Sequence, residues 1–154
     1  MFSEIIFLIL MQNLAVESRS LLSFSDIILR LTDAARAGRL YREQPFVMGL
    51  PASRLKDSFP AEETVLIQGI IDVFFEEEDG YVLLDYKTDA VSAPEELVKR
   101  YRVQLDYYSE ALEQIFGDTA GGGKPVKERI LYSFKLGEEI QVVPPRDGRT
   151  VIPL

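Results

Sequence analysis

Three ionisable residues near the middle of the chain have the types and spacing needed for metal-assisted chemistry. They are Asp72, Asp85 and Lys87, and two apolar runs carry them. Asp79-Gly80 between the runs favours a hairpin with a two-residue loop, because a type I′ turn needs positive φ at both central residues. Counting outward from that loop places Phe74 opposite Asp85 and Asp72 opposite Lys87. All three ionisable side chains are then expected on one face of the sheet.

Two carboxylates that crowd together in a sheet repel each other and lose hydration. Such a pair persists when a cation lies between the carboxylates or when they share a proton. Oxygen ligands suit a hard divalent ion such as Mg²⁺ or Mn²⁺. With Lys87 beside it to hold a water or stabilise negative charge, the group predicts metal-assisted hydrolysis of a phosphodiester. The alternative interpretation is structural: an Asp–Lys ion pair at a strand end and one Asp at a bulge.

The elements that must hold these residues can be read from hydrophobic periodicity and from Pro and Gly. The strand around Pro45 is expected to be bent there or to lie near an edge of the sheet, because Pro45 lacks an N–H group. The second strand is apolar on both faces and is expected to lie in the interior of a sheet. Gln104 lies in the apolar stripe of the last helix, one turn before Tyr108, and a buried Gln requires a polar partner. The expected elements are helices over 23–37 and 94–116 and strands over 39–50, 64–75, 81–87, 126–136 and 139–143.

The order of motifs resembles a known family. Gly69-Ile-Ile-Asp72, Asp85-Tyr-Lys-Thr-Asp89 and Gln104-Leu-Asp-Tyr-Tyr108 occur in this order. Together they resemble the PD-(D/E)XK nuclease superfamily, and more narrowly the C-terminal nuclease domain of the AddA subunit of bacterial AddAB helicase–nucleases, which is related to the RecB nuclease domain. The likeness extends from about Leu21 to about Val143. It implies an α/β, restriction-endonuclease-like αβββαβ core, in which helices flank a mixed central sheet.

The resemblance also implies roles for individual residues. Asp72 and Asp85 would bind Mg²⁺ or Mn²⁺, and Lys87 would assist the attacking water. The backbone carbonyl of Tyr86 would be a further ligand. Glu43, in a segment that resembles the family's E-x-P-F strand, is expected to contribute a carboxylate to the metal site or its surroundings; a surface Glu beside an arginine is the alternative.

Gln104 and Tyr108 match the family's Q-x-x-x-Y motif, which implies that they lie beside the metal site and position substrate phosphate or the acidic ligands. One feature departs from the family: its members carry a metal-ligating His upstream, and this chain has no His. The sequence begins roughly where that upstream region should end, so we expect a core fragment with weaker ion binding. A Cas4-like exonuclease would be expected to carry cysteines, and the chain has none.

Length and composition set the outer limits. The 154 residues predict one domain, with an uncertain leading segment at 1–20 and a tail at 144–154. The absence of Cys excludes disulfides and thiolate zinc sites and suits a cytoplasmic location. The apolar run at 5–11 is too short to span a bilayer, so no membrane contact is expected.

The net charge of −8 is unusual for a protein that binds DNA, because phosphate binding favours a basic surface. Two hypotheses follow. The first is a Mg²⁺-dependent deoxyribonuclease of an AddAB- or RecBCD-like recombination and repair enzyme, to which a helicase domain and a partner subunit of AddB type deliver DNA. The second is a catalytically silent nuclease fold with a structural or subunit-interaction role.

Overall fold

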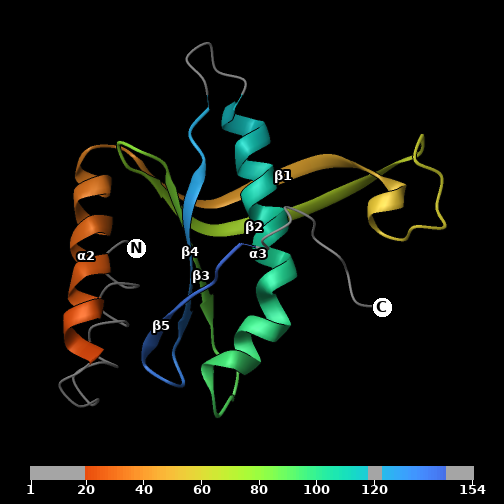
Figure 1. The fold of residues 1–154 in the computed structure, drawn as a ribbon. Coiled ribbons are helices and arrows are strands. Elements are labelled where there is room, and N and C mark those ends of the chain that lie inside the picture. The colour runs from red at the N-terminus through yellow and green to blue at the C-terminus, as the bar shows by residue number, and fades with distance from the viewer. Residues whose placement is uncertain (1–19, 118–122, 145–154) are drawn as a thin grey trace.

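The computed structural model describes residues 20–117 and 123–144. One five-stranded sheet has the order β1-β2-β3-β4-β5; β3 and β4 are parallel and the other neighbours are antiparallel (Figure 1). The mixed sheet and the element order confirm the predicted αβββαβ core, and β5 adds a strand at the far edge. The elements are α2 (Ser20–Arg36), β1 (Leu40–Pro51), the short 3₁₀ helix η1 (Ala52–Arg54), β2 (Thr64–Glu76), β3 (Tyr81–Lys87), α3 (Pro94–Gly117), β4 (Val126–Ser133) and β5 (Glu138–Gln141).

The two helices cover opposite faces of the sheet (Figure 1). The apolar run in β3 is buried on both sides: Leu83 packs in the cluster beneath α3, and Leu84 packs in the cluster beneath α2. This agrees with the continuous apolar sequence of the strand, because an interior strand between two helical layers has no polar face. The chemistry-bearing residues at the end of β3 are therefore held by a strand that is packed from both sides.

The helix ends follow from local sequence. Gly38, with φ of 69°, follows α2 in the left-handed conformation that ends many helices. The predicted start at Ser23 is wrong, because α2 is already formed at Ser20. Pro94 begins α3 as predicted, and Glu95 and Glu96 follow it at the positive end of the helix. None of the helices that the structure describes is long and apolar enough to cross a membrane.

Some predicted segments fall outside the described residues. The apolar run at 5–11 lies in the undescribed range 1–19. Most of the glycine-rich connection, 118–122, and nearly all of the predicted tail, 145–154, are also outside it.

The β2–β3 hairpin differs from the predicted one by two residues. Phe74 pairs with Leu83, and Glu76 pairs with Tyr81 as the last pair of the ladder. The predicted pairs Phe74–Asp85 and Asp72–Lys87 are therefore wrong. The shift is even in number, so every side chain keeps its predicted face.

Gly80 has a different role from the one its position suggested. Positive φ among the described residues occurs at Gly38, Glu43 and Gly137, so Asp79-Gly80 does not form a type I′ turn. The Glu77 N–H instead donates to the Gly80 carbonyl, 2.8 Å away. A Cβ atom on Gly80 would lie 2.7 Å from the Pro125 carbonyl oxygen, so this glycine is needed for the close approach of the chain that enters β4.

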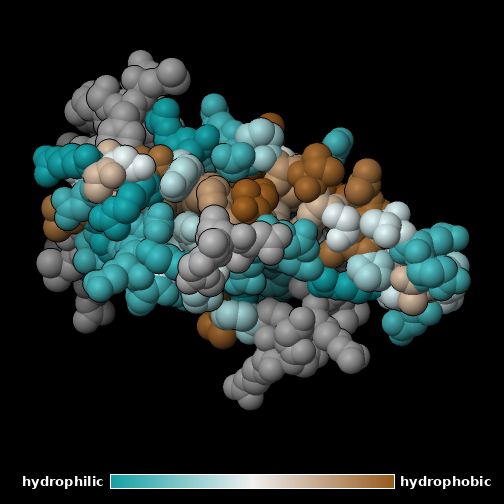
Figure 2. All heavy atoms as spheres, turned by 90° about the horizontal axis from the view of Figure 1, so that it is seen from above, coloured by the Kyte–Doolittle hydropathy of each residue, from teal (hydrophilic) through white to brown (hydrophobic). Residues whose placement is uncertain are grey.

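The first half of β2 is not interior, although its sequence is apolar on both faces. Pairing with β3 begins only at Val73, so residues 64–72 of β2 have β1 as their one partner strand and form a two-stranded ribbon that projects past the sheet (Figure 1). Val47, Leu66 and Ile70 on this ribbon are 64%, 71% and 57% exposed. Hydrophobic side chains gather along this part of the molecule in the space-filling view (Figure 2).

The hairpin tip is tied to α2 by ion pairs, which makes stability depend on pH. Arg30 Nε lies 2.8 Å from the Glu77 carboxylate, and Lys127 Nζ lies 2.5 Å from it. The hydrogen bond from Arg30 is the main reason why the pKa of Glu77 falls from 4.5 to about 2.

We expect acid to remove the contribution of Glu77 to stability. Its folded pKa is below its unfolded pKa, so the stabilisation is complete above pH 4.5 and is lost as the pH falls towards 2. Glu77→Gln should therefore cost about 1–2 kcal/mol at neutral pH, after solvent screening, and almost nothing near pH 2. Urea unfolding of both proteins across this pH range measures the difference. A constant difference at all pH values would contradict this assignment.

Candidate active site

Asp72 and Asp85 meet at the point where β2 and β3 separate. The β2–β3 ladder ends at the pair Val73–Leu84, and the next position on each strand is one of the two aspartates. Beyond this pair, the Tyr86 N–H points at the Asp72 carboxylate, with 3.4 Å between the nitrogen and Oδ2. The side chain of Asp72 thus occupies the place where a ladder hydrogen bond would otherwise form, next to Asp85.

Asp85 is a carboxylate in an almost closed environment. Its exposed fraction is 1%, and it lies near the end of the buried strand β3. Burial raises its pKa to about 6, and the nearby Asp72 carboxylate also raises it, whereas Lys87 opposes the rise. Lys87 Nζ lies 2.5 Å from Oδ2 of Asp85, but that oxygen receives no well-directed hydrogen bond. The contact is a close ion pair, and a carboxylate oxygen has more than one lone pair, so Oδ2 can accept a further partner.

Lys87 connects the carboxylates to α3. Its Nζ donates to Oε1 of Gln104 over 3.1 Å, and Nε2 of Gln104 donates to the Tyr108 hydroxyl over 2.7 Å. The one-turn spacing of Gln104 and Tyr108 places both on the face of α3 that covers the sheet. The amide of Gln104 thus has partners on both sides, which accounts for a Gln within an apolar stripe.

Packing around Tyr108 explains the glycine that precedes Asp72 in the sequence. Phe46 of β1 contacts Tyr108 edge-on, with 5.6 Å between ring centroids and an angle of 79°. A Cβ atom on Gly69 would lie 2.8 Å from the Phe46 ring. Gly69 therefore lets Phe46 lie over β2 and support Tyr108, and Tyr108 supports Gln104. Reasoning from the sequence missed this role of Phe46, although its alternation with buried Met48 indicates an inward side chain.

Tyr86 separates Asp85 from Lys87 and directs its side chain to the other face of the sheet. Its ring contacts Tyr132 and Phe134, with centroids 6.4 and 6.0 Å away. Burial raises the pKa of its phenol, so the side chain stays neutral. The ring is a packing group, and metal ligation by its backbone carbonyl stays a prediction.

Glu43 lies at an irregularity in the β1–β2 ladder. The ladder passes from the pair Arg42–Val73 to the pair Gln44–Ile71, so Glu43 and Asp72 are the residues that it omits. Glu43 has φ of 49°, which is uncommon for a residue other than glycine, and its side chain is exposed. Strained backbone of this kind occurs at functional sites and is held there by the surrounding structure.

We expect Glu43→Gly to separate a structural role from a chemical one. Glycine adopts positive φ without steric cost, so relief of strain should raise the free energy of unfolding by about 1 kcal/mol. The greater flexibility of glycine in the unfolded chain offsets part of this gain. If the carboxylate serves the metal site, the same variant should lose metal-dependent cleavage; if Glu43 is a surface residue, cleavage should be unchanged. Thermal unfolding and cleavage rates of the two proteins measure both effects. A less stable variant would contradict the strain assigned to this residue.

The donor set at this point fits a hard divalent ion held by two carboxylates. Asp85 offers a buried oxygen without a directed hydrogen bond, and Asp72 lies beside it. Mg²⁺ takes one or two carboxylates from a protein and keeps several waters. Within residues 20–117 and 123–144, no cluster of three or more Asp, Glu, His or Cys side chains is placed to hold a metal, so the structure brings two carboxylates together here. A contribution from Glu43 stays a prediction.

Comparison with known proteins identifies the family of the chain. Residues 12–149 match the PD-(D/E)XK nuclease superfamily. The chain belongs to this superfamily. In the PD-(D/E)XK motif, an acidic residue precedes an acid-x-Lys triplet, and in this chain Asp72 and Asp85-Tyr86-Lys87 have those types and that order.

Three curated relatives share one name, which describes each of them as the A subunit of an ATP-dependent helicase/nuclease. The protein of Lachnoclostridium phytofermentans is 40% identical over 77% of this chain and 11% of its own length. That of Clostridium perfringens is 42% identical over 77% and 9%, and that of Clostridium novyi is 42% identical over 83% and 10%. The chain thus spans about a tenth of the length of the relatives it matches.

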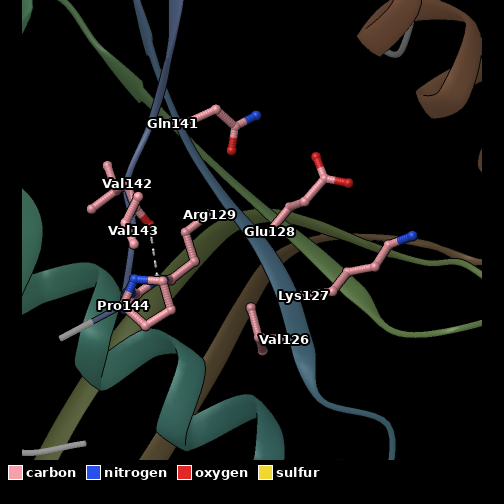
Figure 3. Close-up of a pocket in the computed structure, with 8 residues that line it drawn as sticks. All are labelled: Val126, Lys127, Glu128, Arg129, Gln141, Val142, Val143 and Pro144. Atoms are coloured by element: carbon pink, nitrogen blue, oxygen red, sulfur yellow. Dashed lines mark hydrogen bonds between the residues drawn. The ribbon is translucent and has the colours of Figure 1, made fainter. Parts of the chain in front are cut away.

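A pocket between β4 and β5 contains none of the predicted PD-(D/E)XK residues (Figure 3). Arg129 lies in it, but this side chain is 5% exposed and is paired with Asp106 of α3. Its Nε also donates to the Val142 carbonyl over 3.3 Å. The guanidinium in this pocket is thus engaged in contacts within the fold, and the carboxylate pair is the better candidate for chemistry.

Proposed function

We propose that this chain is a metal-dependent deoxyribonuclease domain that hydrolyses DNA phosphodiesters. The observation that carries the proposal is the convergence of the Asp72 carboxylate, the buried Asp85 carboxylate and the Lys87 ammonium at one point of the sheet. Membership in a nuclease superfamily supports it.

Asp72 and Asp85 hold a Mg²⁺ or Mn²⁺ ion in this proposal. When bound, the ion supplies Lewis-acid polarisation of the scissile phosphate and activation of the attacking water. Lys87 orients that water with its ammonium protons and balances the negative charge that develops on the phosphoryl oxygens. Gln104 holds Lys87 in place, and Tyr108 fixes the orientation of the Gln104 amide.

The biological setting is proposed from the relatives. Because their name describes one component of a helicase/nuclease, we propose that the chain acts with a helicase domain and a partner subunit of AddB type in DNA recombination and repair. The net charge of −8 fits a domain that does not capture DNA alone. Two basic residues of α3 have partners within the chain, Arg100 with Asp89 and Arg102 with the Val143 carbonyl.

The proposal is tested by incubating the purified chain with linear single- and double-stranded DNA in the presence of Mg²⁺ or Mn²⁺. Cleavage that depends on the ion and stops when a chelator is added is the expected result. No cleavage with either ion on either DNA would remove the proposal.

A catalytically silent module is the second candidate, and one observation favours it. The sequence has no His, and the described residues offer two carboxylates but no third side-chain ligand. An incomplete set of ligands binds an ion less tightly, and the fold would then serve a structural or subunit-contact role. Failure of the cleavage test, with the folded state intact by circular dichroism, is the result that this candidate predicts.

A further inference from the structure

We propose that Tyr101 is a positioning residue, and that its ring fixes the ammonium group of Lys87 at the site. The effect of Tyr101 on DNA cleavage rests on the proposed nuclease function, whereas the contact between Tyr101 and Lys87 does not. Lys87 Nζ lies 3.9 Å from the centroid of the Tyr101 ring, well inside the range of a cation–π contact. The Lys87 side chain is 12% exposed, so the contact is largely shielded from water.

The Tyr101 ring is itself held from behind. Its hydroxyl lies 2.9 Å from each oxygen of the Asp89 carboxylate and donates to it. Asp89 also pairs with Arg100, and the hydrogen bond from Tyr101 is the first cause of the lowered pKa of this carboxyl. Donation to a charged acceptor increases the electron density of the phenol, which strengthens the attraction of the ring face for a cation.

The ring supplies something that the other two neighbours of Lys87 do not. Asp85 is a proposed metal ligand, so a bound divalent ion would weaken its hold on the ammonium group. Gln104 supplies one acceptor over 3.1 Å for an ammonium group that carries three protons. The Tyr101 ring limits the ammonium from a third direction without using a lone pair of the site, and it therefore keeps Lys87 in place when Asp85 is engaged elsewhere.

Core packing alone does not account for Tyr101. The ring is partly buried and packs against the cluster beneath α3, as Val103 does. A purely apolar residue would serve that purpose, but here the hydroxyl is engaged by Asp89 and the ring face by Lys87. Both residues belong to one run, Asp85-Tyr-Lys-Thr-Asp89, so the last residue of β3 contacts the ring face and a residue just after β3 contacts the hydroxyl.

The first measurement is independent of activity. Protons on the Lys87 side chain near Nζ should be shifted upfield in the NMR spectrum by the ring current of Tyr101, and they are assigned by their loss in Lys87→Met. We expect the shift to persist in Tyr101→Phe, which keeps the ring, and to disappear in Tyr101→Leu. Val103→Ala, on the same helix, should leave the shift unchanged even if it lowers stability. An unshifted Lys87 signal in the wild-type chain, or a shift that survives in Tyr101→Leu, would overturn the proposal.

The second measurement is the rate of metal-dependent DNA cleavage. Tyr101→Leu should lower kcat about 3- to 30-fold at unchanged KM, which corresponds to the range of a shielded cation–π contact, and Tyr101→Phe should recover most of the loss. Equal kcat values for Tyr101→Leu and the wild type would overturn the positioning role. If the wild-type chain does not cleave DNA, the nuclease proposal fails. The NMR result alone then decides whether the Tyr101 ring holds Lys87 in place.

Discussion

Asp85→Ala is expected to abolish metal-dependent DNA cleavage, with a fall in kcat of about 10³-fold or more. The substitution removes a proposed metal ligand and also frees Lys87 from its closest charged neighbour. Stability should change much less than activity. The buried carboxylate of Asp85 has a raised pKa, which means that its ionised form is disfavoured in the fold and contributes no stability at neutral pH.

The measurement is the initial rate of cleavage of linear DNA at saturating Mg²⁺, together with thermal unfolding of the same samples. Asp57→Ala is the matched control, because it removes the same charge from an exposed loop far along the chain from the site. Asp85→Asn keeps the size of the side chain and should be as inactive as the alanine variant. Cleavage by Asp85→Ala at the wild-type rate would exclude Asp85 from the chemistry.

Asp106→Ala is expected to lower the free energy of unfolding by about 3–5 kcal/mol, the largest change in stability that the structure predicts. Asp106 and Arg129 are 9% and 5% exposed and form an ion pair between α3 and β4. Loss of the aspartate leaves a buried guanidinium without a counter-charge. Within the described residues Arg129 Nη2 already lacks a hydrogen-bond partner, so little remains to compensate.

Urea unfolding measures this cost, and a double variant separates the penalty of an unpaired charge from the loss of a contact. Asp106→Leu combined with Arg129→Met removes both charges and should lose less stability than Asp106→Ala alone, because apolar residues often replace a buried ion pair at little cost. Asp106→Ala with a change below about 1 kcal/mol would show that the pair is open to water.

The site was predictable in its parts because short-range rules determine them. Alternation along β2 and β3 placed Asp72, Asp85 and Lys87 on a common face. That placement is correct although the predicted two-residue turn is not. The observed register is displaced by two residues, and a displacement of two restores the same face, whereas a displacement of one would have reversed it. The one-turn spacing of Gln104 and Tyr108 likewise needed only helical periodicity.

Features that depend on distant parts of the chain were not predictable from one sequence. Gly80 looked like a turn residue, but Pro125 determines its role, and the two are far apart in the sequence. One face of β2 is exposed because β3 pairs only with the second half of β2. The apolar sequence of β2 gives no sign of where this pairing stops. The contact of Tyr101 with Lys87 likewise forms only once α3 lies on the sheet.

Titration of the chain with Mn²⁺ in a calorimeter tests most directly the central claim that Asp72 and Asp85 share one divalent ion. We expect one ion per wild-type chain, much weaker binding in Asp72→Asn and in Asp85→Asn, and little further loss when both substitutions are combined, because each removes the same site. Binding that is unchanged by Asp72→Asn, or losses from the two substitutions that simply add, would contradict a shared ion.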